Sequence, residues 1–325
     1  MISGGILNID KAQNMTSHDV VSAVRRITGI KRVGHTGTLD PMASGVLPVC
    51  IGKSTRIMEY LDLDLKTYRC TMILGIDTDT QDIWGTEISR RAVDVSEDDV
   101  RRVFSAFSGL ITQTPPMYSA LKVNGKKLYE YAREGKTVEV KSRQIYIHKM
   151  IIEDVDLSGE EKKVTFIVEC SKGTYVRTIC RDAGEALGCG AALCALERIQ
   201  SGIFSVGDAI KLEDLQKTSR EQLQSMLIPS WAPLIHFGKI IIEPAAAVRF
   251  VSGQHISFAQ CRAVREPEFA EKDFYIPARE EYRRAYNVFC SLQEREIFLG
   301  VAFLDERGKK LIPDKVFSCT ADLIR

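Results

Sequence analysis

The sequence predicts a mixed α/β protein built from two domains. The chain has 325 residues, and a single domain commonly has about 100–200. Hydrophobic residues make up 45% and charged residues 27%, which is typical of a globular chain that buries a full core. Helical and strand patterns alternate over the first two-thirds of the chain, whereas the last third carries short strand patterns.

Three segments carry apolar residues at helical spacing, and residues suited to helix ends flank them. These expected helices cover residues 19–28, 96–107 and 176–187. Thr16 or Ser17 can cap the first helix, and Gly29 ends it because glycine adopts the left-handed conformation at low cost. Ser96-x-x-Asp99 resembles a capping box at the start of the second helix.

Strands are expected over residues 68–74 and 164–170, and prolines on both sides of Trp231 mark a boundary at 230–240. Beyond that boundary, short strands at 287–291, 296–304 and 310–317 with a turn at 305–308 predict a small β-rich domain. We therefore expect domains at residues 1–235 and 236–325. The Pro-, Tyr-, Lys- and Gly-rich stretch 113–135 is interpreted as an exposed functional loop with a helical piece near 128–133.

The net charge of +1 conceals an uneven distribution. Residues 1–150 carry 21 basic and 17 acidic side chains, residues 151–238 carry 9 and 13, and residues 239–325 carry 14 and 13. The local excess is largest over residues 20–56 and 111–150, each with a net of +5. Solvated surface is one reading of such charge. Two basic stretches in one half, one of them interleaved with tyrosines, also favour a local site for a polyanion.

Several classes of protein lack support in the sequence. No apolar run approaches the roughly 18 residues that a membrane helix needs, and the N-terminus lacks the pattern of a signal peptide, so we expect a cytoplasmic protein without a membrane partner. The nine cysteines are scattered without Cys-x-x-Cys, which indicates reduced thiols. Phosphate-loop, dinucleotide and zinc-deaminase spacings are also missing, so we expect no nucleotide cofactor and no metal.

The run from Val33 to Val49 is dense in Gly, Thr and Pro, which predicts a shaped loop. Asp40 is the only acid between Asp19 and Glu59. A lone Asp before Pro is commonly a turn residue or a helix cap. An isolated carboxylate in a positive field is also expected to be ionised, which makes Asp40 a candidate for chemistry.

Five segments in order resemble bacterial tRNA pseudouridine-55 synthases of the TruB type. The segments are Gly5–Lys11, Gly34–Pro48, Leu74–Gly85, Gln113–Arg133 and Cys170–Thr178. The resemblance covers most of the first 230 residues. It implies a catalytic domain with a mixed, mainly antiparallel sheet, a thumb-like RNA-binding insertion at about 113–140 and a small C-terminal PUA-like, barrel-like domain.

The resemblance also implies a role for individual residues. Asp40 would be the catalytic carboxylate, Arg177 would pair with it, and Tyr68 would stack on the uracil and assist removal of the C5 proton. Contacts to the substrate are implied for His35, Tyr175, Leu196, Lys11 and Lys172, the two lysines as phosphate contacts. In the insertion, RNA contacts are implied for Tyr118, Lys122, Lys126, Lys127, Tyr131 and Arg133.

The implied reaction is the conversion of the T-loop uridine of tRNA to pseudouridine by a cofactor-free enzyme, which we expect to be a monomer. The target uridine must be flipped out of the folded RNA before its glycosidic bond is reachable. Two alternatives stay open: a non-catalytic tRNA-binding or folding helper, and a pseudouridine synthase that acts on another RNA. The chain departs from the family pattern at Ala12 and at Asn14, where glycine is usual and where Asn can keep the turn. It also departs at Glu197, where arginine is common.

Overall fold

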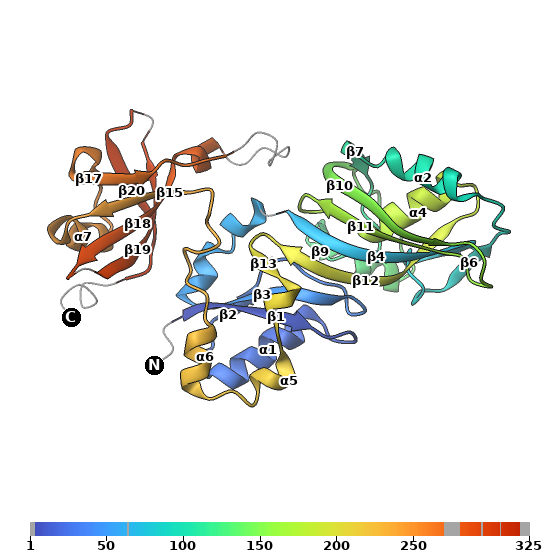
Figure 1. The fold of residues 1–325 in the computed structure, drawn as a ribbon, viewed down its shortest axis with the longest axis horizontal. Coiled ribbons are helices and arrows are strands. Elements are labelled where there is room, and N and C mark those ends of the chain that lie inside the picture. Colours follow the sequence, from blue (N-terminus) through green and yellow to red (C-terminus); the bar gives the residue numbers. More distant parts are fainter. Residues whose placement is uncertain (1–3, 64, 270–279, 294, 306, 319–325) are drawn as a thin grey trace.

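The computed structural model describes residues 4–63, 65–269, 280–293, 295–305 and 307–318. Two large sheets form the molecule, a ten-stranded sheet in the first 211 residues and a six-stranded sheet near the C-terminus (Figure 1). The predicted mixed α/β class is confirmed. Within the described residues, no helix is long and apolar enough to cross a membrane.

The ten-stranded sheet is mixed and mainly antiparallel. Its strands are β1 (Gly4–Lys11), β2 (Val33–His35), β3 (Ser44–Gly52), β4 (Lys66–Leu74), β7 (Gly109–Gln113), β10 (Arg143–Asp156), β11 (Lys163–Cys170), β12 (Ala191–Ser201), β13 (Phe204–Ser205) and β14 (Ile210–Lys211). The main path runs β14-β1-β3-β12-β4-β11-β10-β7. Only the β1–β14 and β3–β12 pairs in it are parallel. Strands far apart in sequence therefore meet at β4 and β12, in the middle of the sheet.

Helices cover both ends of this sheet (Figure 1). They are α1 (Ser17–Thr28), α2 (Glu97–Ser105), α4 (Val176–Ala186), α5 (Leu212–Leu215) and α6 (Arg220–Met226). Thr16 caps α1 and Gly29 ends it with φ 71°, while Ser96 and Asp99 form the expected capping box of α2. The predicted helices are confirmed, because local capping and one apolar face specify each of them.

The insertion at 113–140 contains a short hairpin and one helical turn and a half. Its elements are β8 (Lys122–Val123), β9 (Lys126–Lys127) and α3 (Leu128–Arg133), and α3 has the predicted bounds. The prediction of an exposed loop is wrong for part of the segment. Gln113, Ser119 and Leu128 are at most 5% exposed, and the base of the insertion is hydrogen-bonded to the segment at the start of α4.

The C-terminal part is a curled six-stranded sheet with one helix. Its elements are β15 (Gly238–Ile242), α7 (Pro244–Val251), β16 (Ile256–Ser257), β17 (Cys261–Arg265), β18 (Ala285–Leu292), β19 (Arg295–Leu304) and β20 (Lys310–Val316). The sheet order is β16-β20-β19-β18-β15-β17. The predicted β-rich character is confirmed. The expected turn at 305–308 includes residue 306, which lies outside the described residues.

A shared apolar cluster joins the two parts of the molecule. Tyr60 and Leu61, from the 3₁₀ helix η2 (Tyr60–Leu63), pack with Phe237 and Tyr282 from the C-terminal part. Burial of such aromatic side chains is worth a few kcal/mol in total. The hairpin of β5 (Ile76–Thr78) and β6 (Glu87–Arg90) lies at the end of the ten-stranded sheet that is farther from the C-terminal part (Figure 1).

Candidate active site

The loop that carries Asp40 is held on both sides of that residue. Ser17 is buried, accepts a hydrogen bond from the Leu39 backbone N–H (2.9 Å) and donates its hydroxyl to the Leu39 carbonyl (3.2 Å). On the other side, the Asn14 backbone N–H donates to the Pro41 carbonyl at 2.8 Å. Asn14 has φ 62°, so the expectation that Asn can keep the glycine-type turn is confirmed. The backbone of Asp40 is therefore fixed before any substrate binds.

Lys11 supplies a third anchor for this loop. Its side chain is 0% exposed, and Nζ donates to the carbonyls of Ala12, Met15 and Pro41 at 2.9, 2.7 and 3.3 Å. Burial lowers the pKa of Lys11 to about 8, although the nearby Asp40 carboxylate opposes this shift. The expected phosphate contact is not supported, because a fully buried ammonium bonded to three carbonyls offers no surface to RNA. The sequence shows a lysine but not that the turn folds over it.

Arg177 lies beneath Asp40 at the start of α4 and is only 4% exposed. Its guanidinium forms ion pairs with Asp40 Oδ2 at 3.0 Å and with Asp82 Oδ2 at 3.4 Å. It also donates to the carbonyls of Thr80 and Tyr118, each at 3.0 Å. Charge-assisted bonds of this kind orient a carboxylate as well as stabilise it. The structure thus brings Arg177 to Asp40, as the sequence predicts.

Asp82 is a member of the site to which sequence reasoning assigned no role. It is 1% exposed, and its Oδ1 accepts hydrogen bonds from the Thr80 hydroxyl and the Trp84 backbone N–H. Burial raises the pKa of Asp82, and both the Thr80 hydrogen bond and the charge of Arg177 oppose that rise. The signal available in the sequence was the second acid of the Thr78–Asp82 segment of the family pattern.

A small pocket of about 80 Å³ opens over Asp40. Its lining comes from the loop that carries Asp40, from β4, from β12 and from the start of α4, namely Thr38, Leu39, Asp40, Tyr68, Thr174, Tyr175, Val176, Arg177 and Leu196. Five of the predicted site residues therefore meet in one place. The apolar and aromatic walls around a single carboxylate suit a flat ring that must be both stacked and approached at one edge.

Tyr68 stays a neutral phenol in this pocket. It is 8% exposed, and burial raises its pKa to about 12, with the charge of Arg198 opposing the rise. At neutral pH only about one molecule in 10⁵ would carry the phenolate. This geometry agrees with stacking, whereas removal of the C5 proton by a free phenolate base is not supported.

Arg198 is a second site residue that sequence reasoning missed. It is 0% exposed, lies opposite Tyr68 in the β4–β12 register, and donates to the carbonyls of Val46 (2.7 Å) and Gly37 (3.2 Å). No carboxylate among the described residues forms an ion pair with it. Gly45 has φ 97°, and a Cβ there would lie 2.3 Å from the Arg198 carbonyl oxygen, so only glycine fits. Arg198 thus ties both sides of the loop that carries Asp40 to β12.

Tyr175 is held at the pocket rim from two directions. Its backbone exchanges two hydrogen bonds with the buried Gln113 side chain, at 2.8 and 3.0 Å. The Arg143 guanidinium lies 4.9 Å from the centre of its ring. Leu196, on β12, is 7% exposed and lines the same pocket. Glu197 follows Leu196 in β12 and lines a neighbouring groove together with Gln13 and Ser44. Glu197 does not line the pocket over Asp40.

The remaining predicted contacts lie outside this pocket. His35 is on β2, its buried Nδ1 has no hydrogen-bond partner, and burial lowers its pKa, as do the nearby Arg198 and His18. Lys172 is exposed on the turn before α4. Neither residue lines the pocket over Asp40, so neither contacts a group that is held inside this pocket.

The insertion presents a basic and aromatic surface. Lys122 and Arg133 are exposed, while Lys126 and Lys127 lie over the rings of Tyr131 and Tyr129 at 4.8 and 5.3 Å. Tyr118 donates its hydroxyl to Asp79 at 3.2 Å. Cation–aromatic pairs keep the side chains extended and still leave positive charge at the surface.

The described residues contain no group of three or more His, Cys, Asp or Glu side chains placed to hold a metal ion. Eight cysteines lie in the described residues, all as free thiols. Burial raises the pKa of the Cys70 and Cys180 thiols well above the ordinary value, which makes them poor nucleophiles. Asp40 is the carboxylate that lines the pocket.

Comparison with known proteins identifies the family. A model of the "TruB family pseudouridylate synthase (N terminal domain)" matches residues 25–176, and a model of the "tRNA pseudouridylate synthase B C-terminal domain" matches residues 177–234. The tRNA pseudouridine synthase B of Clostridium novyi (strain NT) is 46% identical over 94% of this chain and 98% of its own length. The chain belongs to the TruB family. Another TruB-family relative, tRNA pseudouridine synthase B of Alkaliphilus oremlandii (strain OhILAs), is 47% identical over 78% of this chain and 82% of its own length.

Solved structures support the fold. A crystal structure of a Cbf5-Nop10-Gar1 complex contains a chain with a TM-score of 0.73 and 25% identity, and the alignment covers 99% of this chain and 87% of that one. The archaeal box H/ACA sRNP Nop10-Cbf5 complex gives a TM-score of 0.71 at 24% identity, with 99% and 88% covered. The predicted pseudouridine-synthase fold with a C-terminal PUA-like sheet is confirmed.

Proposed function

We propose that this chain isomerises the uridine at position 55, in the T loop of tRNA, to pseudouridine. The observation that carries the proposal is the geometry of Asp40. This carboxylate is 35% exposed at the floor of an aromatic pocket and is held by Arg177 at 3.0 Å. The TruB-family relatives named tRNA pseudouridine synthase B supply the substrate class.

Each pocket residue has a task in this reaction. The bond between C1′ and N1 of the uridine breaks, the base turns, a new bond forms between C1′ and C5, the C5 proton leaves and N1 gains a proton. Asp40 either adds covalently or stabilises developing positive charge at C1′. Arg177 holds and aims the carboxylate through their ion pair, while the Tyr68 ring supports the base as it turns.

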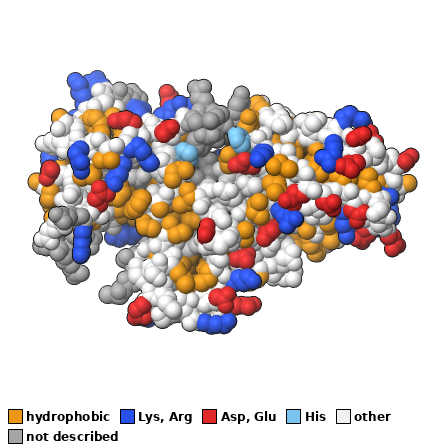
Figure 2. Space-filling model, viewed as in Figure 1, with side chains coloured by type: hydrophobic (Ala, Val, Ile, Leu, Met, Phe, Trp, Pro, Cys, Tyr) orange, Lys and Arg blue, Asp and Glu red, His pale blue; other side chains and the backbone are white. Residues whose placement is uncertain are grey.

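The proposed reaction also suggests a role for each domain. Residues 1–235 form the catalytic domain, the insertion at 113–140 grips the T arm, and residues 236–325 form a PUA-like domain that contacts RNA. The enzyme works as a monomer in the cytoplasm, without metal or organic cofactor. Figure 2 shows acidic and basic side chains interspersed over one face of the molecule. With so little net charge, selectivity rests on loop shape and the flipped base, with phosphates bound at a few local sites.

Release of tritium from C5-labelled uridine in a T-arm RNA tests the proposal directly. The wild-type chain should release it, and Asp40→Asn should release none while its affinity for the RNA stays within about twofold. Asp98→Asn is the matched control, because Asp98 is an exposed carboxylate in the first turn of α2. Turnover by Asp40→Asn would show that the assigned chemistry is wrong.

The same assay separates the two alternatives. Release from ribosomal RNA fragments but from no T-arm substrate would identify a pseudouridine synthase with a different target. Tight binding of tRNA with no release from any RNA would identify a helper. The intact set of Asp40, Arg177 and Tyr68 in one pocket favours the catalytic outcome.

A further inference from the structure

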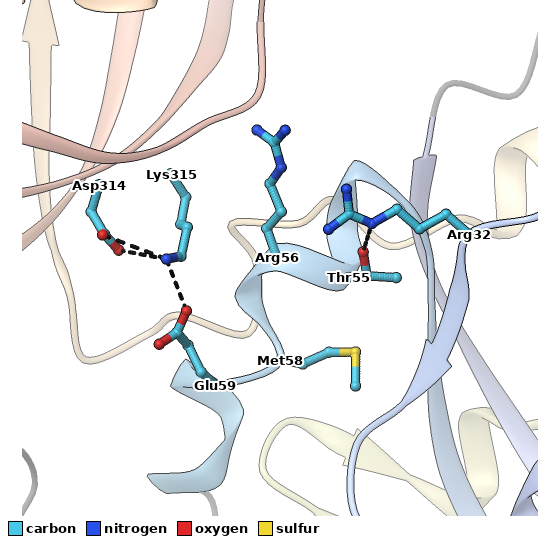
Figure 3. Close-up of a pocket in the computed structure, with 7 residues that line it drawn as sticks. All are labelled: Arg32, Thr55, Arg56, Met58, Glu59, Asp314 and Lys315. Carbon is cyan, nitrogen blue, oxygen red and sulfur yellow. Dashed lines mark hydrogen bonds and ion pairs between the residues drawn. The ribbon is translucent and has the colours of Figure 1, made fainter. Parts of the chain in front are cut away.

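A second cavity lies where the two parts of the molecule meet. It has a volume of about 530 Å³ and is lined by Arg32, Thr55, Arg56, Met58, Glu59, Asp314 and Lys315 (Figure 3). Arg32 precedes β2, Thr55 and Arg56 belong to the 3₁₀ helix η1 (Lys53–Ile57), and the last two residues lie on β20. None of these residues lines the pocket over Asp40.

The acidic side chains of this groove are already matched. Lys315 forms ion pairs with Glu59 at 2.9 Å and with Asp314 at 3.4 Å, and the Tyr60 hydroxyl donates to Asp314. The three charges of this network lie together at one side of the groove (Figure 3). Both carboxylates of the groove are therefore paired with Lys315 and not with Arg32 or Arg56.

Both arginines are positioned but electrically unpaired. Arg32 donates Nε to the Thr55 hydroxyl at 2.6 Å, and Arg56 donates one terminal nitrogen to the Val316 carbonyl at 2.6 Å. Among the described residues, neither has a carboxylate within ion-pair distance, and each keeps unused guanidinium donors. Figure 3 shows both guanidinium groups apart from the network of Lys315, Glu59 and Asp314. Planar guanidinium forks match the oxygens of phosphate, which is the group that such a pair recognises best.

The backbone around these arginines is tied down. Thr55 donates its hydroxyl to the Gly52 carbonyl at 2.9 Å, and the Gly52 N–H donates to the Arg32 carbonyl at 2.7 Å. Lys53 donates Nζ to the Phe317 carbonyl at 2.5 Å, which links η1 to the end of β20. An anion that binds here therefore meets donors that need little reorganisation.

The groove and Asp40 lie at opposite ends of β3. Asp40 is close to the start of β3 at Ser44, whereas the arginines flank its end at Gly52. Nine residues of β-strand span roughly 26 Å. If the target loop of an RNA lies in the pocket over Asp40, the groove is too far away for the same loop to reach. Only a more distant part of that RNA would contact the groove.

We propose that Arg32 and Arg56 form a second RNA contact that binds one backbone phosphate of the substrate, outside the target loop. This inference rests on the proposed function, since it takes RNA as the substrate. The contact would strengthen binding and fix the orientation of the RNA without touching the reacting base.

The test compares Arg32→Gln/Arg56→Gln with Arg101→Gln/Arg102→Gln. The control removes the same charge from α2, where both arginines are exposed and paired with Glu97 and Asp99. Affinity for an unmodified tRNA transcript is measured over a salt series in the Asp40→Asn background, so turnover is not required. One phosphate contact contributes about one unit to the slope of log K against log salt. The groove variant should lose about that much and bind roughly tenfold more weakly at low salt, while the control stays unchanged.

Three further measurements make the outcome decisive. Single-turnover pseudouridine formation at saturating enzyme should be unchanged in an Asp40-containing groove variant. Arg32→Lys/Arg56→Lys should recover most of the slope, and thermal unfolding should show that each variant is folded. An unchanged salt slope, or a loss that the α2 control reproduces, would overturn the inference. Failure of all turnover by the wild-type chain would instead overturn the proposed function and leave the binding result standing.

Discussion

Removal of the Arg177 guanidinium should destabilise the fold chiefly through Asp82. The Asp82 side chain is 1% exposed, and its Oδ2 has no hydrogen-bond partner besides the ion pair to Arg177 at 3.4 Å. Arg177→Met would leave this charge buried and unpaired, and such a loss typically costs about 3–5 kcal/mol. Asp40 is 35% exposed and can be hydrated instead. We therefore expect the free energy of unfolding to fall by about 3 kcal/mol at pH 7.

The deficit should depend on pH. Burial raises the pKa of Asp82 in the folded protein, and loss of the Arg177 charge would raise it further. The folded variant then binds a proton at a pH where the unfolded chain still has an ionised carboxylate. Because stability rises as pH falls whenever the folded state binds more protons, the deficit should shrink between pH 7 and pH 5.

A double-mutant cycle in urea separates the structural from the catalytic role of Arg177. Adding Asp82→Asn to Arg177→Met removes the orphaned charge, so we expect a coupling free energy of about 2 kcal/mol. Tritium release should stay absent in the double variant, since Asp40 still lacks its partner. A coupling below about 0.5 kcal/mol, or a deficit that is equal at pH 5 and pH 7, would refute the assignment of Asp82 as the main source of the cost.

Two further predictions concern the frame of the pocket. The pKa of Lys11 is lowered from 10.5 to about 8 in the folded protein. Between these two pH values the Lys11 amine is protonated in the unfolded chain but largely neutral in the folded one. The contribution of Lys11 to the free energy of unfolding therefore increases with pH in this range. Urea unfolding at pH 7.5 and pH 10 should show the wild type gaining about 2 kcal/mol relative to Lys11→Met; equal pH profiles would contradict a buried, titrating Lys11. Tyr68→Leu should lower kcat more than Tyr68→Phe, by about 5–100-fold, because stacking on a base is worth about 1–3 kcal/mol. Equal losses would contradict the stacking role.

Local signals in the sequence predicted the helices well. They could not predict the buried contacts of the site, which join residues that are far apart in the sequence. The capping boxes and apolar faces of α1 and α2 act within a few residues. Asn14 could be assigned a left-handed turn for the same reason. Arg198 could not be predicted as a neighbour of Tyr68, because the β4–β12 register contains two irregularities and joins residues 130 positions apart. The burial of Lys11 could not be predicted either, because it depends on a turn that closes over the side chain.

One arginine connects Asp40 with the insertion. Arg177 bonds to Asp40 and, through the same terminal nitrogen, to the Tyr118 carbonyl at the base of the insertion. A shift of the base of the insertion would therefore move an acceptor of Arg177 and, with it, the partner that orients the Asp40 carboxylate. If the insertion binds RNA as proposed, docking of the RNA and the orientation of Asp40 are coupled through this single guanidinium group.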